Sequence, residues 1–520
     1  MSADQPWWRR VFGQPSSSQS PPALPAPTKA HRTVAAGRAR RYESAASGRI
    51  AAGWSAPSAG PNSEIDAARA TLRDRSRDLA RNSPLAQRAL TVLTSALVGE
   101  GIRPSVSTGD AELDRQLLAL WSSLGLDIDT DGRTDAYGMQ TLATRAWLES
   151  GEVFLRRRWR RPDDGLPVPV QIQILESDLL ADTAWRPPHL LPDSRLQYGI
   201  VIDGIGRRVA YEMYRAHPGE TLSSSASASL ETVMVPASEI SHVYHSTRPG
   251  QLRGVPWLAQ VMLDLRDLDD LEHAEIVRQK MQACLAMFRE TESLDPETIA
   301  SRDDVEQDDD GAWIETLRPG MIAKLPPGEV VKFLAPQQFG GFAEAAKHYQ
   351  RVIAVGSQVP YELLTGDLSQ VNYASIRAGD LEFRRLVGVL CRQVVVPHIC
   401  APMWRWIIEA GMLSGRLPEM RGAQLTAALS PHWHPPRWIA IDREGEVKAD
   451  ILEIQAGLRT HAQAAAERGG DWRALVEQLA AEKSEAADLG VNLIGFSSLS
   501  PSQAVTLADA PRAGKEKSAR

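Results

Sequence analysis

The amino-acid sequence predicts a mixed α+β fold. Helical periodicity dominates the chain before about residue 150, and it returns from Pro256 onward. Between these blocks, residues of about 150–247 form short β-prone segments in which apolar and polar side chains alternate. Helices on both sides of a β-rich region, without regular strand–helix alternation, are typical of the α+β class.

The composition sets broad limits on the class of protein. The length of 520 residues corresponds to roughly three domains, and 43% hydrophobic with 24% charged residues excludes wholesale disorder. The sequence has no run of 18 or more apolar residues and no secretory h-region, so neither a transmembrane helix nor a signal peptide is expected. Three cysteines, Cys284, Cys391 and Cys400, cannot build a disulfide framework and indicate a reducing, cytoplasmic setting.

The net charge of −7 bears on nucleic-acid binding. A protein that grips nucleic acid tightly carries a surplus of Lys and Arg, and this chain does not. It is compatible with a protein that surrounds DNA without holding it.

The N-terminal part begins with a flexible stretch. Residues 1–60 are rich in Pro, Ser and Ala and carry more basic than acidic residues, so we expect a basic arm, either with a partner or as an unstructured tail. Order is expected from Asn62 or Ser63, with Ser63 as the N-cap of a first helix. A second helix should start with Pro84 in its first turn, and a third should cover 111–125.

The β-rich region has its strands at 152–161, 168–176, 198–203, 209–214 and 233–245. After it, an apolar stripe of helical spacing predicts a helix that runs to about Arg289, some 45–50 Å long. Such a length suggests a strut packed against partner subunits rather than buried in its own domain. The stripe consists of Leu258, Val261, Met262, Leu265 and Leu268.

The second half of the chain continues this organisation. An acidic block at 292–310 and a β-like stretch at 313–334 precede a returning helix at 342–357, which predicts a helical hairpin with a small structure at its tip. A polar segment then leads to a long amphipathic helix that Pro397 should kink or interrupt. Residues 442–489 read as helices broken at Gly457 and at 469–470, and the tail from about 497 should be loose.

Catalytic and metal-binding motifs are mostly absent from the sequence: there is no phosphate-binding loop, nucleophile elbow or zinc helix. Residues 127–132, DIDTDG, match the first half of a calcium loop, but position twelve is Gly138 instead of the required Glu. We therefore favour an Asp/Gly turn that caps the helix opening near Tyr137. The pairs His432/His434 and His242/His245 lack further ligands and favour packing, in a loop for the first pair, over a metal site.

The run of five arginines around Trp159, at 156–161, leaves three interpretations open. It contacts nucleic acid, it forms salt bridges with a neighbouring subunit, or it is a solvated edge strand protected from aggregation. On an alternating strand the arginines divide between two faces.

Several motifs, in this order, resemble the portal proteins of tailed bacteriophages, in the lambda-type family. The resemblance covers roughly residues 38–490. Its carriers are RARRYESAASGR and Trp54, LRDRSRDLARNSPLAQRAL leading into LVGEGIRP, Trp121 with 131–133 and 151–154, HVYHSTRPGQLRGVPWL, LPPGEVVKFLAP and VPYELLTGDLSQVNYASIR.

The resemblance implies a portal fold with a wing, a long-helix stem, a small clip and a helical crown, assembled as a ring. The expected parts are a flexible basic arm (1–60), wing (61–257), stem helix (258–290), clip (291–336), second stem helix (337–357), tunnel loop (358–376), kinked helix and wing (377–441), crown (442–496) and flexible tail (497–520).

The resemblance also implies a structural role without catalytic residues, metal or cofactor. A ring, usually of twelve copies, sits at one capsid vertex of the virion after assembly in the bacterial host cytoplasm, and double-stranded DNA passes through it during packaging and ejection. Its other expected partners are the terminase large subunit, the head–tail connector, and capsid and scaffold proteins, which the N-terminal arm would face. An anionic ring would lower friction on DNA through like-charge repulsion.

Two groups of site residues follow from the resemblance. The tunnel loop is expected to meet the passing duplex, with a structural turn that never faces DNA as the alternative; its residues are Asp367, Ser369, Gln370, Asn372 and Tyr373. The acidic tip of the clip is expected to steer a basic partner, with a merely solubilising role as the alternative; its residues are Asp308, Asp309 and Asp310.

Two other classes of function compete with this interpretation. A nuclease or protease would need Asp127, Asp129, Asp131 and His242 to converge on one site. A DNA-binding adaptor that uses the arginine run would bind free duplex tightly and with strong salt dependence. The particle mass separates these from a ring, because only the ring is about twelve times the chain mass with a central hole.

Overall fold

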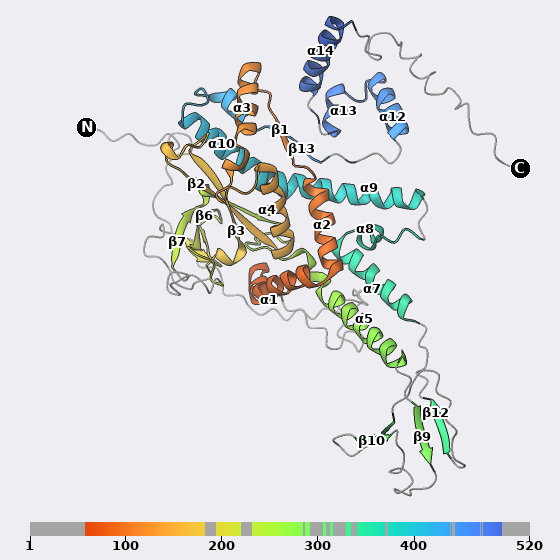
Figure 1. The fold of residues 1–520 in the computed structure, drawn as a ribbon. Coiled ribbons are helices and arrows are strands. Elements are labelled where there is room, and N and C mark those ends of the chain that lie inside the picture. Colours follow the sequence, from red (N-terminus) through yellow and green to blue (C-terminus); the bar gives the residue numbers. More distant parts are fainter. Residues whose placement is uncertain are drawn as a thin grey trace, which may run out of the picture. The chain divides into compact units, whose positions relative to one another are not determined.

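The chain contains both helices and strands, as the α+β prediction requires (Figure 1). The computed structural model describes residues 58–181, 194–219, 231–283, 287–291, 305–307, 313–315, 329–333, 341–369, 373–436, 438, 443–468, 470 and 472–490. Short 3-10 turns join several elements: η4 (Gly125–Ile128), η5 (Pro162–Asp164), η6 (Ser177–Leu179), η8 (Ala237–Glu239) and η9 (Trp257–Gln260). The predicted arm and tail lie outside the described residues, apart from 58–60.

Four helices open the described chain: α1 (Pro61–Asn82), α2 (Pro84–Val98), α3 (Ala111–Ser123) and α4 (Ala136–Ser150). The second and third predicted helices are confirmed, and Ser83 caps α2 by accepting a hydrogen bond from the Ala86 amide. The predicted N-cap of α1, Ser63, is wrong by three residues. Gly60 is the N-cap, and the Ser63 hydroxyl donates to the Gly60 carbonyl at 2.9 Å instead of capping the helix.

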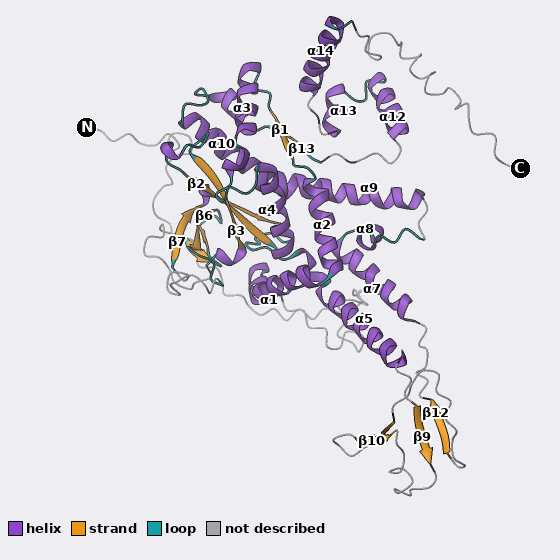
Figure 2. Ribbon diagram, viewed as in Figure 1, coloured by secondary structure: helices purple, strands orange, loops and turns teal. Residues whose placement is uncertain are grey.

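The strands of the middle region form two antiparallel sheets (Figure 2). In the first, β2 (Glu152–Trp159) lies between β3 (Val170–Glu176) and β8 (Ile240–Tyr244), with Leu155 opposite Ile174 on one side and Ser241 on the other. The second sheet has the order β4 (Arg195–Gln197), β5 (Ile200–Ile202), β6 (Arg208–Tyr214) and β7 (Thr232–Pro236). The alternation therefore predicted the strands, and β4 is the one strand here that it missed.

Two hydrophobic clusters hold this region together. The larger cluster joins α2, α4, the start of α5 and the long helix around Trp404, and its members include Leu93, Trp147 and Leu265. The smaller cluster lies on the four-stranded sheet and includes Phe154 and Tyr211. Residues on the two faces of β2 thus enter different cores, which is why this strand is apolar at Val153, Phe154 and Leu155 in succession.

The predicted helical hairpin is present, but its first helix is shorter than expected. α5 (Met262–Ala283) is preceded by η9, and residues Met287–Thr291 form the strand β9 instead of continuing the helix to about Arg289. α7 (Phe342–Ser357) returns beside α5 (Figure 1). The stripe predicted to pack against partner subunits is buried within its own chain: Leu258, Val261, Met262, Leu265 and Leu268 all belong to the larger core.

Four short strands lie between α5 and α7. β9 pairs with β12 (Glu329–Phe333), and β10 (Val305–Gln307) pairs with β11 (Trp313–Glu315), both antiparallel. The β-like stretch predicted at 313–334 is thus confirmed at its two described parts. Most of the acidic block 292–310 lies outside the described residues.

A long helical path follows the hairpin. The short helix α8 (Tyr361–Thr365) precedes α9 (Tyr373–Leu390), which continues through a π-helical segment, η10 (Cys391–Cys400), into α10 (Ala401–Leu413). Pro397 lies inside the π-helical segment, so the path changes its helical type there but is not broken. After α11 (Gly422–Leu429), β13 (His432–His434) pairs with β1 (Arg103–Ser105).

The continuous helix formed by α9, η10 and α10 contains the most apolar long helical stretch among the described residues. Gly379–Leu413 is long and apolar enough to cross a membrane, judged by length and composition alone, and 44% of its most apolar window is buried inside the structure. Its buried side chains, among them Val395, Ile399 and Ile407, belong to the larger core. We therefore interpret it as a core helix.

Three helices close the described chain: α12 (Arg443–Gln455), α13 (His461–Glu467) and α14 (Trp472–Asp488). Gly457 has a positive φ of 73° and follows α12, which confirms the predicted break there. Asp450 forms ion pairs with Arg459 and Arg468 that hold α12 to the chain around α13.

Candidate functional site

The segment between α7 and α9, predicted to meet DNA, is ordered at its beginning. α8 ends at Gly366, which adopts a left-handed φ of 75°. Asp367 follows and turns its carboxylate to its own chain. It accepts hydrogen bonds from the Ser369 amide at 3.0 Å and the Ser369 hydroxyl at 2.6 Å, and one from the Tyr361 hydroxyl at 3.3 Å.

Lys347 of α7 completes this arrangement, with its Nζ 3.5 Å from the Asp367 carboxylate. The hydrogen bonds from Ser369, and then the nearby Lys347 charge, lower the pKa of Asp367 to about 2. Two predicted contact residues, Asp367 and Ser369, therefore bind each other at the start of the segment. The Asp367 charge is compensated by α7 and α8.

The remaining predicted residues of both groups are not described. Gln370 and Asn372 lie outside the described residues, and Tyr373 is known only as the first residue of α9. Asp308, Asp309 and Asp310 also lie outside them, in the chain that joins β10 to β11. Their roles stay predictions.

The exposed surface of α5 is anionic. The helix carries Asp264, Asp267, Asp269, Asp270, Glu272 and Glu275 against Arg266, Arg278 and Lys280. Glu275 pairs with Arg278 one turn away, and Arg266 is 3.9 Å from Asp270. The acids exceed the bases, so this helix would repel phosphate groups rather than hold them.

A buried ion pair that the sequence did not reveal ties the sheet to the start of α5. Glu152 and Arg253 each have 1% side-chain exposure. Arg253 Nε lies 2.9 and 3.1 Å from the two carboxylate oxygens, and the Gly254 amide donates to the same carboxylate at 2.9 Å. Arg253 also donates to the Tyr198 carbonyl at 3.1 Å, which adds the edge of the second sheet.

His242 is the third partner of Glu152, at 3.0 Å from its carboxylate. Burial lowers the pKa of His242 to about 4, although the carboxylate partly offsets that effect, so the imidazole is neutral at pH 7 and donates from Nε2. For Glu152, burial acts to raise the pKa, but the Arg253 charge and the His242 hydrogen bond outweigh it and hold the pKa low.

Two glycines let the start of β2 and the chain that leads to η9 approach each other closely. A Cβ on Gly254 would lie 2.0 Å from the Gly151 carbonyl oxygen, and a Cβ on Gly151 would lie 2.5 Å from the backbone of Val255 and Pro256. Two of the quoted family motifs, 151–154 and the segment HVYHSTRPGQLRGVPWL, therefore meet here backbone to backbone. Charged residues flanked by apolar neighbours, such as Glu152 before Val153 and Arg253 after Leu252, were the available sequence signal.

The arginine run is divided between intramolecular partners. Arg157 pairs with Glu409 of α10 at 2.7 Å and lies 4.7 Å from the centre of the Trp159 ring. Arg160 pairs with Asp164 at 2.9 Å. β2 has a neighbour on both sides only as far as Arg156, and from Arg157 to Trp159 it pairs with β3 alone. The interpretation as an edge strand is therefore wrong at Arg156 but agrees with the pairing from Arg157 onward. Arg158 remains exposed.

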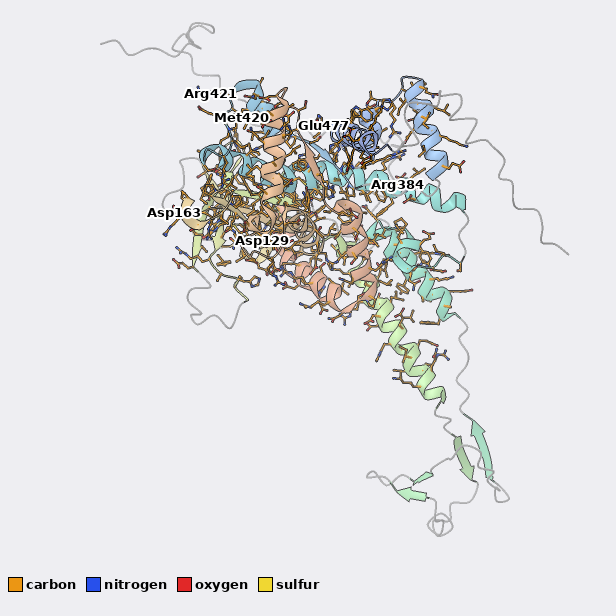
Figure 3. The ribbon with its side chains drawn as sticks, turned by 45° about the horizontal axis from the view of Figure 1, so that its top comes forward. Asp129, Asp163, Arg384, Met420, Arg421 and Glu477 are labelled. Atoms are coloured by element: carbon orange, nitrogen blue, oxygen red, sulfur yellow. The ribbon has the colours of Figure 1, made fainter. Side chains whose placement is uncertain are left out.

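The DIDTDG segment is a turn, as favoured, but it does not cap the helix near Tyr137, so that part of the prediction is wrong. The Asp129 carboxylate is nearly buried and accepts hydrogen bonds from the amides of Asp131, Arg133 and Thr134 at 3.1 to 3.3 Å. Figure 3 labels Asp129 among the packed side chains of this region. The cap of α4 is made by Asp135, which accepts from the amides of Tyr137 and Gly138.

The histidine pair at 432 and 434 lies on a strand, so the loop expected there is wrong. His434 Nε2 is 2.8 Å from the Ser105 hydroxyl, and Trp433 between the two histidines packs on Trp121 and Trp404. His242 binds Glu152 instead of the aspartates at 127–131. The convergent site that an enzyme would need is therefore not formed by these residues.

Within the described ranges, one group has donor atoms spaced closely enough for a metal ion: Glu176, Asp178 and His217. Two guanidinium groups of α1 already occupy it. Arg73 lies 3.0 Å from Asp178, and Arg77 lies 2.7 Å from Asp178 and 3.0 Å from Glu176. Because these cations compensate the carboxylates, we interpret the group as an ion-pair network between α1 and the sheet.

Comparison with known proteins gives a family match and several relatives. Residues 47–390 match the family described as "Phage portal protein, lambda family". A probable portal protein of Halomonas phage phiHAP-1 is 27% identical over 469 residues, 87% of this chain and 85% of the relative. The portal protein of Escherichia phage N15 is 24% identical over 486 residues (85% and 89%), and portal protein B of Escherichia phage lambda is 24% identical over 460 residues (80% and 84%).

Solved structures with similarity include the neck of a native gene transfer agent (GTA) particle computed with C12 symmetry. It is 16% identical with a TM-score of 0.41, and the similarity covers 81% of this chain and 97% of that one. The neck of an empty GTA particle computed with C6 symmetry gives a TM-score of 0.43 with the same identity and coverage.

Proposed function

Because the chain belongs to the lambda family of phage portal proteins, we propose that its copies close into a ring of twelve at one capsid vertex and that double-stranded DNA passes through this ring. The family match over residues 47–390 is the observation that carries the proposal. It spans the two sheets, the α5–α7 hairpin, the predicted tunnel segment and all of α9. The chain would then be a structural component of the virion rather than an enzyme.

Charge supports the passage of DNA. Each phosphate that a fixed Lys or Arg neutralises adds a contact that must be broken as DNA advances. The net charge of −7 and the surplus of acids on α5 keep such contacts few. The arginine run, the most basic segment of the described chain, has Arg157 and Arg160 engaged by its own acids.

The decisive measurement for the ring is particle mass with negative-stain microscopy of the purified full chain. We expect a species of twelve times 56.9 kDa with a central hole. A monomer under all assembly conditions would contradict the proposal.

We propose that residues 370–373 contact the DNA. Asp367 and Ser369 engage each other and α7, so the contact falls to the uncharged Gln370, Asn372 and Tyr373. Deleting 370–372 should leave ring assembly intact and reduce packaging or retention of DNA. Unchanged packaging and retention would favour the alternative, a turn that does not face DNA.

We propose that the acidic tip of the clip steers the terminase large subunit, and later the head–tail connector, during docking. Changing Asp308, Asp309 and Asp310 to Asn should slow terminase association and reduce its dependence on salt, since long-range attraction between exposed charges is screened by ions. Association rates equal to those of the unmodified ring, at low and high salt, would leave only a solubilising role.

A further inference from the structure

The α5–α7 hairpin has two outward faces that the described part of the chain leaves exposed. The outer α5 face consists of Leu263, Asp267, Asp270 and Ala274, and the outer α7 face consists of Glu344, His348, Arg351 and Val355. Within each set the spacing is three or four residues, so each set follows one side of its helix. Leu263 is 70% exposed and Val355 is 79% exposed, so each outer face presents a large apolar side chain that a partner could cover.

The two faces are complementary in chemistry. The outer α5 face combines an apolar residue with the anions Asp267 and Asp270. The outer α7 face combines an apolar residue with the cation Arg351 and with His348, and its one anion, Glu344, lies at the end of the face farthest from Val355. No described residue forms an ion pair with Asp267 or Arg351; Arg351 has only the Tyr361 ring, 6.0 Å from its guanidinium.

The residues of the two faces also lie at matching levels along the hairpin. A Cβ on Gly356 would lie 2.3 Å from Val261 Cγ1, and the Trp257 indole donates to the Ser357 carbonyl at 2.8 Å, so residue 261 lies opposite residue 356. The helices run in opposite directions and each rises about 1.5 Å per residue. To within one residue, Leu263 is therefore level with Val355, Asp267 with Arg351 and Asp270 with His348.

These faces cannot meet within one chain. In each helix the outer face lies about a quarter to half a turn from the buried residues, which are Met262, Leu265 and Leu268 in α5 and Ala346, Ile353, Ala354 and Ser357 in α7. The buried sides pack toward each other and the core, so the outer faces point away from each other. A second copy at the same level would bring its outer α7 face against the outer α5 face of the first.

We propose that the outer α5 face of one copy packs against the outer α7 face of the next, with Leu263 against Val355 and Asp267 paired with Arg351. This inference rests on the proposed ring. Each copy uses both faces once, so the contact is head-to-tail and can continue around a closed ring. The apolar stripe of α5 joins the core of its own chain, and these outer faces join the copies.

Charge reversal tests the contact. Asp267→Arg and Arg351→Asp each place like charges opposite each other, so each should weaken ring assembly by roughly tenfold or more, and the double variant should recover most of the loss. Asp269→Arg is the matched control: Asp269 is exposed on the same helix about 200° around the axis from Asp267, and this variant should assemble normally. The readout is the mass distribution against total protein concentration.

Cysteine pairs test the direction of packing. Under mild oxidation, and with Cys284 replaced by Ser in every variant, Leu263→Cys with Val355→Cys in one chain should give a ladder of covalent multimers on a non-reducing gel. Leu263→Cys alone and the unmodified chain should give none. A dimer from Leu263→Cys alone would mean a two-fold contact and would overturn the head-to-tail arrangement.

The outcomes separate the two proposals. Rings of normal mass from Asp267→Arg and Arg351→Asp, without a cysteine ladder, would overturn this contact and leave the ring intact. A monomeric unmodified chain would overturn the ring and this contact with it.

Discussion

Glu152 and Arg253 illustrate how a single pair of residues can fix two parts of the chain. They lie 101 positions apart in sequence, and their side chains are almost inaccessible to solvent. Taking two charges out of water is favourable only when each is compensated. The His242 ring and the Gly254 amide donate further hydrogen bonds to the Glu152 carboxylate. The pair therefore secures the position of the sheet relative to the chain that enters α5.

We predict that Glu152→Gln lowers the free energy of unfolding by about 3–5 kcal/mol, because it leaves the buried Arg253 charge uncompensated. Chemical denaturation followed by circular dichroism would measure it. Glu112→Gln is the control: Glu112 pairs with Arg115 on an exposed helix surface, and its loss should cost at most about 1 kcal/mol. Equal effects of the two substitutions would contradict this account.

Asp367 gives a prediction of pH dependence. Its folded pKa of about 2 lies below the ordinary value of 3.8, so the carboxylate stabilises the start of the segment between α8 and α9 above about pH 4 and loses that effect as the pH falls through 2. Hydrogen exchange of peptides covering 361–369, corrected for the intrinsic rate, should rise over this interval. Asp367→Ala should show the faster exchange already at neutral pH, with no further change on acidification.

At the scale of secondary-structure elements, the α5–α7 hairpin depends on one close approach. Gly356 has no room for a Cβ because Val261 lies against it, whereas Gly388 of α9 has open space. We predict that Gly356→Ala destabilises the protein by about 1–3 kcal/mol through overpacking. Gly388→Ala should stabilise it by up to about 1 kcal/mol, because alanine is the better helix former. Thermal unfolding of both variants would check the opposite signs.

Sequence periodicity predicted the two helices of the α5–α7 hairpin better than it predicted the surfaces against which they pack. The stripe from Leu258 to Leu268 correctly indicated an apolar helix face. Its assignment to partner subunits was wrong because periodicity says that a face is covered but not which surface covers it. The end of α5 was missed for a related reason: Met287–Thr291 contains no Gly or Pro that would end a helix, and pairing with β12 makes it a strand.

At the scale of the whole molecule, electrostatics gives the clearest expectation. The net charge is −7, so we predict that assembled rings retain free linear duplex weakly at physiological salt. The binding constant should change little with salt concentration, since few counterions are released. Filter binding between low and moderate salt would measure this. Tight binding with a steep salt dependence would instead favour a DNA-binding adaptor.

The fold class could be predicted from hydrophobic periodicity, and the family from several short motifs that occur in a fixed order. The contacts that join these motifs in the folded chain could not be predicted. Glu152, His242 and Arg253 converge only after two sheets have formed, and Asp367 receives its partners from α7 and α8. Such distances in sequence leave no local pattern to recognise.

The π-helical segment has a consequence for the tolerance of the chain to deletions. A π turn holds more residues than an α turn, so the side of α10 that faces inward depends on how many residues lie between Cys391 and Cys400. Each residue removed there would swing α10 by about 100° around its axis. Trp404, whose ring contacts those of Trp121 and Trp433, would then lose both contacts. Deleting one residue from this segment should therefore destabilise the protein more than most single substitutions within it.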